Sequence, residues 1–212
     1  MNKIDAVIFD LGNVLVAVDE GRAAGRLAAR VAKTRQHIEE YAGNTPHAAQ
    51  LALGKLTRQQ FFEIIVRDLS FTGTYAEFAG IWSEIFTPIE PMIAFATALK
   101  SHVRRRLVLS NTNAIHMDYI MQHYAFMKDF DALVLSHEVN LLKPDVAIYQ
   151  HALSKHGLKA EQTIFIDDLA DNVESARRVG LRAIQFQNPE QVRAEFIKLG
   201  VLPVSFQIAS DN

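Results

Sequence analysis

Short runs of apolar residues alternate with amphipathic segments along most of the chain. Five of these runs show little alternation of apolar and polar residues, as is typical of strands buried on both faces of a parallel sheet. Helix-like segments separate the last four runs: one covers residues 113–124, one begins with Pro144, and one begins near Asp171 with Glu174 completing a capping box. This order predicts an α/β fold built on a parallel five-stranded sheet. The predicted strands are Ala6–Phe9, Leu107–Leu109, Ala132–Leu135, Ile164–Ile166 and Ala183–Phe186.

The gap between the first and second predicted strands contains only helix-like patterns and is too long for a single crossover connection. Thr57 and Gln60 fit a capping box at the start of one helix, and a further helix is expected over residues 75–86. The gap therefore predicts an α-helical bundle inserted after the first strand. Apolar residues at helical spacing mark the packed faces of these two helices: Phe61, Ile64, Ile65 and Leu69 in one, Phe78, Ile81, Trp82 and Ile85 in the other.

These patterns predict two domains. Residues 1–17 and 88–212 are expected to form the α/β core, and residues 18–87 the inserted helical domain. The stretch Thr87–Pro91 is expected to be a linker that returns the chain to the core, because its two prolines resist helix formation.

Composition and charge narrow the range of functions. The chain has 212 residues, a net charge of -2 and no cysteine. This balance argues against general binding of nucleic acid or a membrane surface, and the lack of cysteine excludes thiolate metal sites and a cysteine nucleophile. The basic run Arg104–Arg106 is expected to be a solvated lead-in to the second strand. No apolar run approaches the roughly 20 residues that span a bilayer, and no secretory pattern opens the chain, so we expect a cytoplasmic protein.

Polar residues follow several of the predicted strands. Each of them alone has an ordinary explanation as a helix cap or a turn residue. Ligands of open α/β sheets bind beyond the carboxyl ends of the strands, so we expect the whole set to meet at one edge of the sheet. The set consists of Asp10 after the first strand, Ser110 and Asn111 after the second, Lys143 before the helix that begins with Pro144, and Asp167 and Asp168 after the fourth strand.

Such a group of carboxylates needs a cation. Neighbouring carboxylates repel one another, and a hard divalent ion such as Mg²⁺ relieves the repulsion while keeping open positions for water and phosphate. The hydroxyl of Ser110 and the ammonium of Lys143 are suitable donors to phosphoryl oxygens. Asp10 is then the group that can attack phosphorus and form an aspartyl-phosphate. The pattern predicts a magnesium-dependent enzyme acting on a small phosphate ester, and it leaves the oligomeric state open.

The strings IFDLGNVLV, LVLSNTN, LLKPD and FIDDLADN resemble the four motifs of the haloacid dehalogenase (HAD) superfamily, in the right order. The resemblance covers the sheet domain almost completely, and it implies a Rossmann-like core with a helical cap, as in the phosphatase-like branch. Within that branch the strings are most similar to the bacterial glucose-1-phosphatase subgroup. The resemblance implies these roles: Asp10 as nucleophile, the Gly12 carbonyl with Asp10, Asp167 and Asp168 as magnesium ligands, Ser110 and Asn111 as holders of the phosphoryl group, and Lys143 as its neutralising cation.

The chain departs from the family pattern at Gly12, where most phosphatases of the superfamily carry an aspartate that acts as a general acid. General acid catalysis is typically worth about 10²–10⁴-fold. We therefore expect a preference for esters with stable leaving groups, such as sugar 1-phosphates. His116 and His137 are alternative proton donors, because histidine titrates near neutrality. An ordinary surface position is the simpler explanation for both histidines.

Two other functions compete with a phosphatase. A low-turnover protein that binds phosphate or a sugar phosphate would explain Gly12 as a record of lost chemistry. A 2-haloacid dehalogenase would use the same aspartate on carbon without a metal. It would have little use for Asp167 and Asp168 together, and its family carries a bulky aromatic residue at the position of Gly12.

Overall fold

The computed structural model describes residues 3–31 and 33–208. Its centre is a sheet of five strands: β1 (Ala6–Phe9), β4 (Arg105–Ser110), β5 (Ala132–Leu135), β6 (Thr163–Asp167) and β7 (Arg182–Gln185). The strand order is β5-β4-β1-β6-β7, and every neighbouring pair is parallel. The expected α/β fold with a parallel five-stranded sheet is confirmed, and the strand ends differ from the expected ones by at most two residues.

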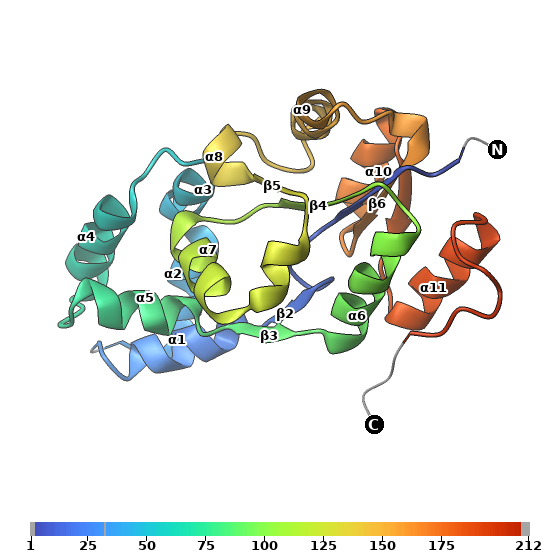
Figure 1. Cartoon of the computed structure of the whole chain (residues 1–212). Helices are drawn as coiled ribbons and strands as arrows, with labels where there is room; N and C mark the ends of the chain where they lie inside the picture. The colour runs from blue at the N-terminus through green and yellow to red at the C-terminus, as the bar shows by residue number, and fades with distance from the viewer. Residues whose placement is uncertain (1–2, 32, 209–212) are drawn as a thin grey trace.

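Helices cover both faces of the sheet (Figure 1). They are α6 (Glu90–Ala98), α7 (Ala114–His123), α8 (Ser136–Val139), α9 (Val146–His156), α10 (Ala170–Arg178) and α11 (Pro189–Lys198), with short 3₁₀ turns at Leu99–Ser101, Ala125–Asp129 and Ala160–Gln162. Alternate residues of β1 face opposite sides, so Val7 and Phe9 pack towards α6, α7 and α11, whereas Ile8 packs towards α9 and α10. Burial on both faces explains the continuous apolar runs within the three central strands, β4, β1 and β6.

A helical insertion interrupts the core between two short antiparallel strands, β2 (Val16–Val18) and β3 (Phe86–Pro88). Its helices lie together on the left of Figure 1 and enclose an apolar core that includes Phe61, Ile65 and Phe78. The capping box that joins Thr57 to Gln60 is confirmed. The inserted helices are α1 (Glu20–Ala28), α2 (Arg35–Asn44), α3 (Pro46–Ala52), α4 (Arg58–Leu69) and α5 (Tyr75–Ser83).

The turn between α3 and α4 seats the insertion against α8 of the core. Asn140 donates a hydrogen bond of 2.7 Å to the carbonyl of Leu53. Gly54 has a φ of 66°, and a Cβ atom at this position would lie 2.1 Å from the carbonyl oxygen of His137. Only glycine lets the backbones approach so closely in this conformation, so Gly54 fixes how the insertion sits over the strand ends.

One expected helix start and one expected capping box are wrong. The helix expected to begin with Pro144 begins at Val146, because the side chain of Asp145 accepts a hydrogen bond from the N–H of Ala147 and caps it. The capping box expected at Glu174 is absent: α10 begins at Ala170, and its N-cap residue, Leu169, makes no side-chain cap.

Two expectations about polar or proline-rich stretches also fail. Residues 87–91 return the chain to the core, but their prolines do not exclude regular structure, because β3 pairs with β2 and Pro91 lies in the first turn of α6, where proline is tolerated. Arg106 is not solvated: it is 3% exposed, its guanidinium donates to the carbonyls of Ala96 and Asp129, and it lies over the ring of Phe130. Buried carbonyl acceptors and an aromatic face make an arginine tolerable inside the protein.

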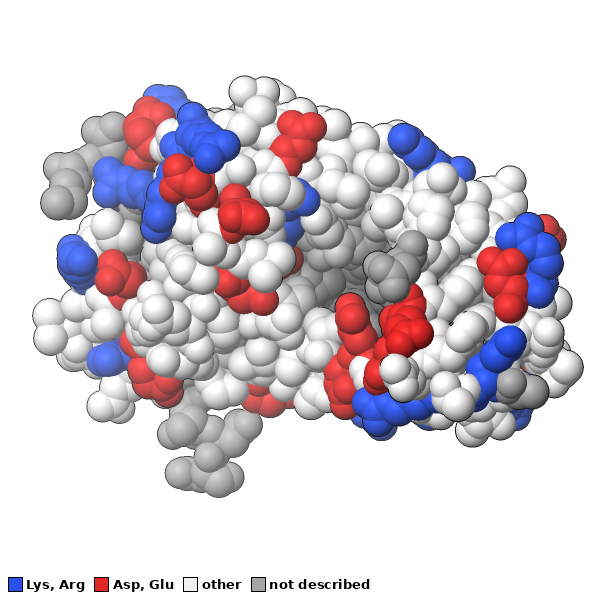
Figure 2. Space-filling view, turned by 180° about the vertical axis from the view of Figure 1, so that it is seen from behind, with Lys and Arg blue, Asp and Glu red and all other residues white. Residues whose placement is uncertain are grey.

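Figure 2 shows that lysine and arginine side chains on the face turned towards the viewer are interspersed with aspartate and glutamate around a largely uncharged centre. On this face the positive charges do not form one continuous patch. Within the described ranges, helices long and apolar enough to cross a membrane are absent.

Candidate active site

The carboxyl ends of the central strands open into a cavity of about 530 Å³, called the active-site cavity below. Ser110 is the last residue of β4, and Asp10 directly follows β1. Asp167 ends β6 and is completely buried beneath the cavity wall. The other residues that the sequence predicts for the site line the cavity itself: Asp10, Gly12, Ser110, Asn111, Lys143 and Asp168.

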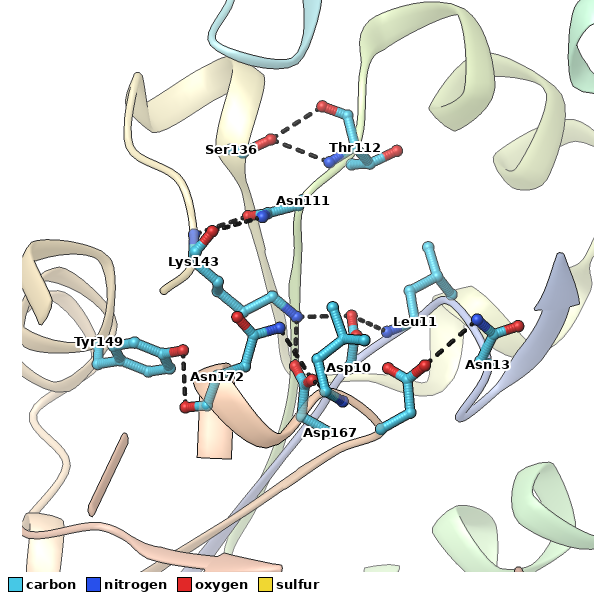
Figure 3. Close-up of polar contacts among 12 residues, drawn as sticks. Asp10, Leu11, Asn13, Asn111, Thr112, Ser136, Lys143, Tyr149, Asp167 and Asn172 are labelled. Carbon is cyan, nitrogen blue, oxygen red and sulfur yellow. Dashed lines mark hydrogen bonds and ion pairs between the residues drawn. The ribbon is translucent and has the colours of Figure 1, made fainter. Parts of the chain in front are cut away.

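Lys143 lies at the centre of the site, and its side chain is only 1% exposed. Its Nζ atom lies 2.8 Å from Oδ1 of Asp10 and 2.7 Å from Oδ2 of Asp167 (Figure 3). The structure thus brings together three residues that are 24 to 157 positions apart along the chain, because the parallel strands all end at one edge of the sheet. Two carboxylates and one ammonium form a compact buried ion network.

Protein donors hold Asp167 in place. Its Oδ1 atom accepts hydrogen bonds of 2.9 Å from the N–H of Leu169 and from the side chain of Asn172. The hydroxyl of Tyr149 donates to the carbonyl of Asn172 at 3.0 Å, which fixes that part of α10 (Figure 3). Both carboxylate oxygens of Asp167 therefore have protein partners, one oxygen with Lys143 and the other with these two donors.

Asn111 positions Lys143 through its backbone. The side-chain amide of Asn111 donates to the carbonyl of Lys143 and accepts from its N–H, both at 2.8 Å. The expected contact between the Asn111 side chain and a phosphoryl group therefore has a competitor, because its oxygen and nitrogen are both bonded to the Lys143 backbone. Ser136 fixes the neighbouring loop in a similar way: its hydroxyl accepts from the N–H of Thr112 at 2.9 Å and lies 2.7 Å from the carbonyl of Ala52 in the insertion.

Burial dominates the electrostatics of Asp10. Removal from water raises its pKa to about 7; the charge of Lys143 opposes this rise, and the charge of Asp167 adds to it. Burial by itself lowers the pKa of Lys143, but the two carboxylates outweigh that effect and raise its pKa above the ordinary value. Lys143 is thus held as a cation, whereas the negative charge on Asp10 is costly unless a further cation is present.

The donor set fits a magnesium ion. Carboxylate oxygens of Asp10, Asp167 and Asp168 lie within 4.8 Å of one another. Hard oxygen ligands on one or two carboxylates, with remaining positions for water and phosphate, are what Mg²⁺ prefers. Asp10 and Asp168 line the cavity, and Asn13 orients Asp168 through a hydrogen bond of 3.3 Å. Gly12 lines the same wall, where its backbone can supply a further oxygen.

His116 lines the cavity but is poorly suited to deliver a proton. Its Nε2 lies 3.2 Å from the carbonyl of Trp82, and its Nδ1 lies 3.1 Å from the side-chain nitrogen of Asn113. These partners assign the neutral ring with the proton on Nε2. Burial lowers the pKa of His116 to about 4, so the imidazole is neutral at physiological pH. His137 is not part of the lining of this cavity.

One acidic residue of the cavity was not predicted from the sequence. Glu20, the first residue of α1, lines the active-site cavity and also a second cavity of about 540 Å³ inside the insertion. The second cavity, called the cap cavity below, includes Glu39 and Trp82 in its wall. The helical pattern of the insertion gives no sign of Glu20, and only its place two residues after Val18 could have drawn attention to it. Five other charged residues of the insertion lie outside the lining of both cavities: Asp19, Arg22, Arg26, Lys55 and Arg67.

A family comparison agrees with this fold and site. The model of the haloacid dehalogenase-like hydrolases matches residues 4–180, and the chain belongs to that family. The expected HAD-like hydrolase is thereby confirmed.

Two relatives of known activity are phosphatases. The chain is 25% identical over 206 residues to a D-ribitol-5-phosphate phosphatase of Bacteroides thetaiotaomicron, a match that covers 91% of this chain and 96% of that enzyme. It is 30% identical over 107 residues to a GMP/IMP nucleotidase of Escherichia coli. The second match covers 50% of this chain and 48% of the nucleotidase, so the chain spans about half the length of this relative. Neither is a glucose-1-phosphatase, so these relatives do not support the expected subgroup.

A solved structure shares the fold. A HAD-family enzyme from Bacteroides thetaiotaomicron, in complex with magnesium and inorganic phosphate, superimposes with a TM-score of 0.79 at 23% identity. The superposition covers 87% of this chain and 94% of that enzyme.

Proposed function

We propose that this chain is a magnesium-dependent phosphomonoester hydrolase that acts on a small phosphorylated metabolite through an aspartyl-phosphate at Asp10. The observation that carries the proposal is the placement of Lys143 between Asp10 and Asp167, with Asp168 beside them at the floor of an open cavity. The magnesium and phosphate bound by the Bacteroides enzyme of the same fold support this choice of ion and ligand.

Each residue has a proposed role. Asp10 attacks phosphorus, because its carboxylate faces the cavity and one of its oxygens is held by the N–H of Leu11 at 2.6 Å. Lys143 neutralises the phosphoryl oxygens, and Ser110 donates to them from the end of β4. Asp10, Asp168 and the carbonyl of Gly12 are the proposed magnesium ligands. Asp167, which we first expected among the ligands, orients Lys143, because both of its oxygens are already bonded.

Bound magnesium would draw negative charge from the phosphoryl group and lower the barrier to nucleophilic attack. The chain itself supplies the nucleophile, the cation and the enclosure. We propose that residues 18–87 form a cap over the core made of residues 1–17 and 88–212, which limits water in the cavity and selects the leaving group.

The candidate substrates are inferred from the relatives and from the sequence motifs. Phosphorylated sugars, polyols and nucleotides are the first candidates, in view of the D-ribitol-5-phosphate phosphatase and the GMP/IMP nucleotidase among the relatives. Sugar 1-phosphates remain in this set, as the motif strings suggest. The low-turnover binding protein is the second candidate function, and Gly12 favours it because the position carries no side chain to transfer a proton.

A phosphatase assay on a panel of these esters, with and without magnesium, tests the proposal. We expect phosphate release that needs the metal and falls at least about 10³-fold in Asp10→Asn, since the covalent route is lost. Asp5→Asn is the matched control: Asp5 lies at the opposite end of β1, pairs with Arg104 near the surface, and should leave the rate unchanged. Saturable phosphate binding without release of product from any ester would favour the binding protein, and an active Asp10→Asn variant would refute the assigned nucleophile.

A further inference from the structure

The position of Gly12 leaves the departing oxygen without an obvious proton donor. When Asp10 displaces an alcohol from phosphorus, the leaving oxygen takes the electron pair of the broken bond and needs a proton. Glycine cannot provide one. Any replacement must be an ionisable side chain that reaches the active-site cavity.

Among the described residues that line this cavity, most of the ionisable side chains already have another role or a protein partner. Asp10 is the nucleophile, Asp168 belongs to the carboxylate group that fits the metal, and Lys143 is held between two carboxylates (Figure 3). His116 has both ring nitrogens in contact with protein partners. Glu20 is the ionisable residue that remains in this lining.

The path of the chain places Glu20 on the same wall as Gly12. Gly12 forms a β-bridge with Val16, at the start of β2. The side chain of Val18, at the end of β2, would lie 3.4 Å from a Cβ atom at Gly12. Val18 and Glu20 both line the active-site cavity, so the chain turns from β2 into α1 along its wall.

Glu20 also stands where the two cavities meet. It belongs to the lining of the active-site cavity and to that of the cap cavity, together with Ile85, Asn113 and His116. A leaving group that extends from phosphorus towards the insertion must pass this junction. Glu20 is exposed, and its carboxylate has no hydrogen-bond or ion-pair partner among the described residues, in contrast to Glu39, which Arg35 holds at 2.7 Å.

We propose that Glu20 is the general acid and base of this enzyme, in place of the side chain missing at Gly12. The inference rests on the proposed function. In the first step the bond between Asp10 and phosphorus forms, the bond to the leaving oxygen breaks, and that oxygen takes the proton of the Glu20 carboxyl group. In the second step the oxygen of a water molecule bonds to phosphorus while the bond between Asp10 and phosphorus breaks. The Glu20 carboxylate takes the proton that this water loses, so inorganic phosphate leaves and Glu20 is protonated again. Hydrolysis is then not restricted to esters with stable leaving groups. This differs from the substrate preference that we expected from the missing side chain at Gly12 alone.

The test compares two substrates that differ in how much they need a proton. p-Nitrophenyl phosphate has a stable leaving group, whereas the alkyl phosphate cleaved best in the panel does not. For Glu20→Gln we expect kcat on the alkyl phosphate to fall by about 10²–10⁴-fold and kcat on p-nitrophenyl phosphate by less than about tenfold. Glu63→Gln is the control, because Glu63 is exposed on α4 and contacts Gln59 of the same helix; both rates should remain those of the wild type.

Rescue separates proton transfer from substrate binding. Gly12 lies outside the glycines with positive φ, and Val18 Cγ2 at 3.4 Å is the one atom found within 4 Å of an added Cβ. An aspartate therefore fits there, and Glu20→Gln combined with Gly12→Asp should regain at least about tenfold on the alkyl phosphate. Equal losses on both substrates, no loss on either, or a double variant no better than Glu20→Gln would overturn the role of Glu20. A wild-type protein inactive on both compounds would instead overturn the proposed function and this assignment with it.

Discussion

The half-buried imidazole of His116 should make the stability of the protein depend on pH in a defined window. Burial lowers its pKa from 6.5 to about 4, while the unfolded chain exposes the ring and restores the ordinary value. Well above pH 6.5 the ring is neutral in both states and does not affect the stability. As the pH falls from 6.5 towards 4, the unfolded state binds a proton that the native state does not, so the native state loses stability.

The magnitude follows from the two pKa values. At about 1.36 kcal/mol per pKa unit, the full difference is worth about 3 kcal/mol, and about 2 to 3 kcal/mol of it is expressed between about pH 7.5 and about pH 4.5. We expect the free energy of unfolding to fall by that amount more in the wild type than in His116→Gln, which cannot titrate. Urea unfolding followed by circular dichroism at both pH values, without metal, measures the difference.

His37→Gln is the matched control, because His37 is a histidine on the exposed surface of α2. The difference between wild type and this control should change by less than about 0.5 kcal/mol over the same range. If the His116→Gln difference were equally flat, the imidazole would be accessible to water, and His116 would return as a candidate proton donor.

Two further predictions concern the packing around the site. Lys143→Met leaves the carboxylates of Asp10 and Asp167 without their shared cation and should cost about 3–5 kcal/mol in metal-free urea unfolding; a loss below about 1 kcal/mol would contradict the buried network. Gly54→Ala should destabilise the protein by at least about 1–2 kcal/mol and lower kcat/KM, because its Cβ meets a backbone carbonyl at a positive φ. Gly80→Ala in α5, where an added Cβ has open space, should instead be neutral or stabilising by up to about 1 kcal/mol, and equal melting temperatures of the two variants would refute the argument.

The order of strands and helices could be predicted from the sequence because burial on both faces leaves an unbroken apolar run in each strand. The helical insertion was also predictable, since its apolar spacing and the Thr57 capping box are local signals. Local signals failed where a tertiary partner decided the outcome. Arg106 belongs to a basic run that usually faces water, yet two distant carbonyls and an aromatic ring bury it.

The sequence by itself determined which chemical groups stand at the strand ends, because Asp10, Ser110 and Asp167 directly end or follow runs whose pattern predicts buried strands. Tertiary structure alone decided their partnerships. Both carboxylate oxygens of Asp167 have protein partners, and the side-chain amide of Asn111 is hydrogen-bonded to the Lys143 backbone. Only the structure shows that Glu20 lines the active-site cavity, because its position depends on the path of the chain from β2 into α1. The physical reason is that the end of a strand can be predicted from the apolar run that precedes it. The direction and the hydrogen-bond partners of a side chain depend instead on segments that meet only when the chain has folded.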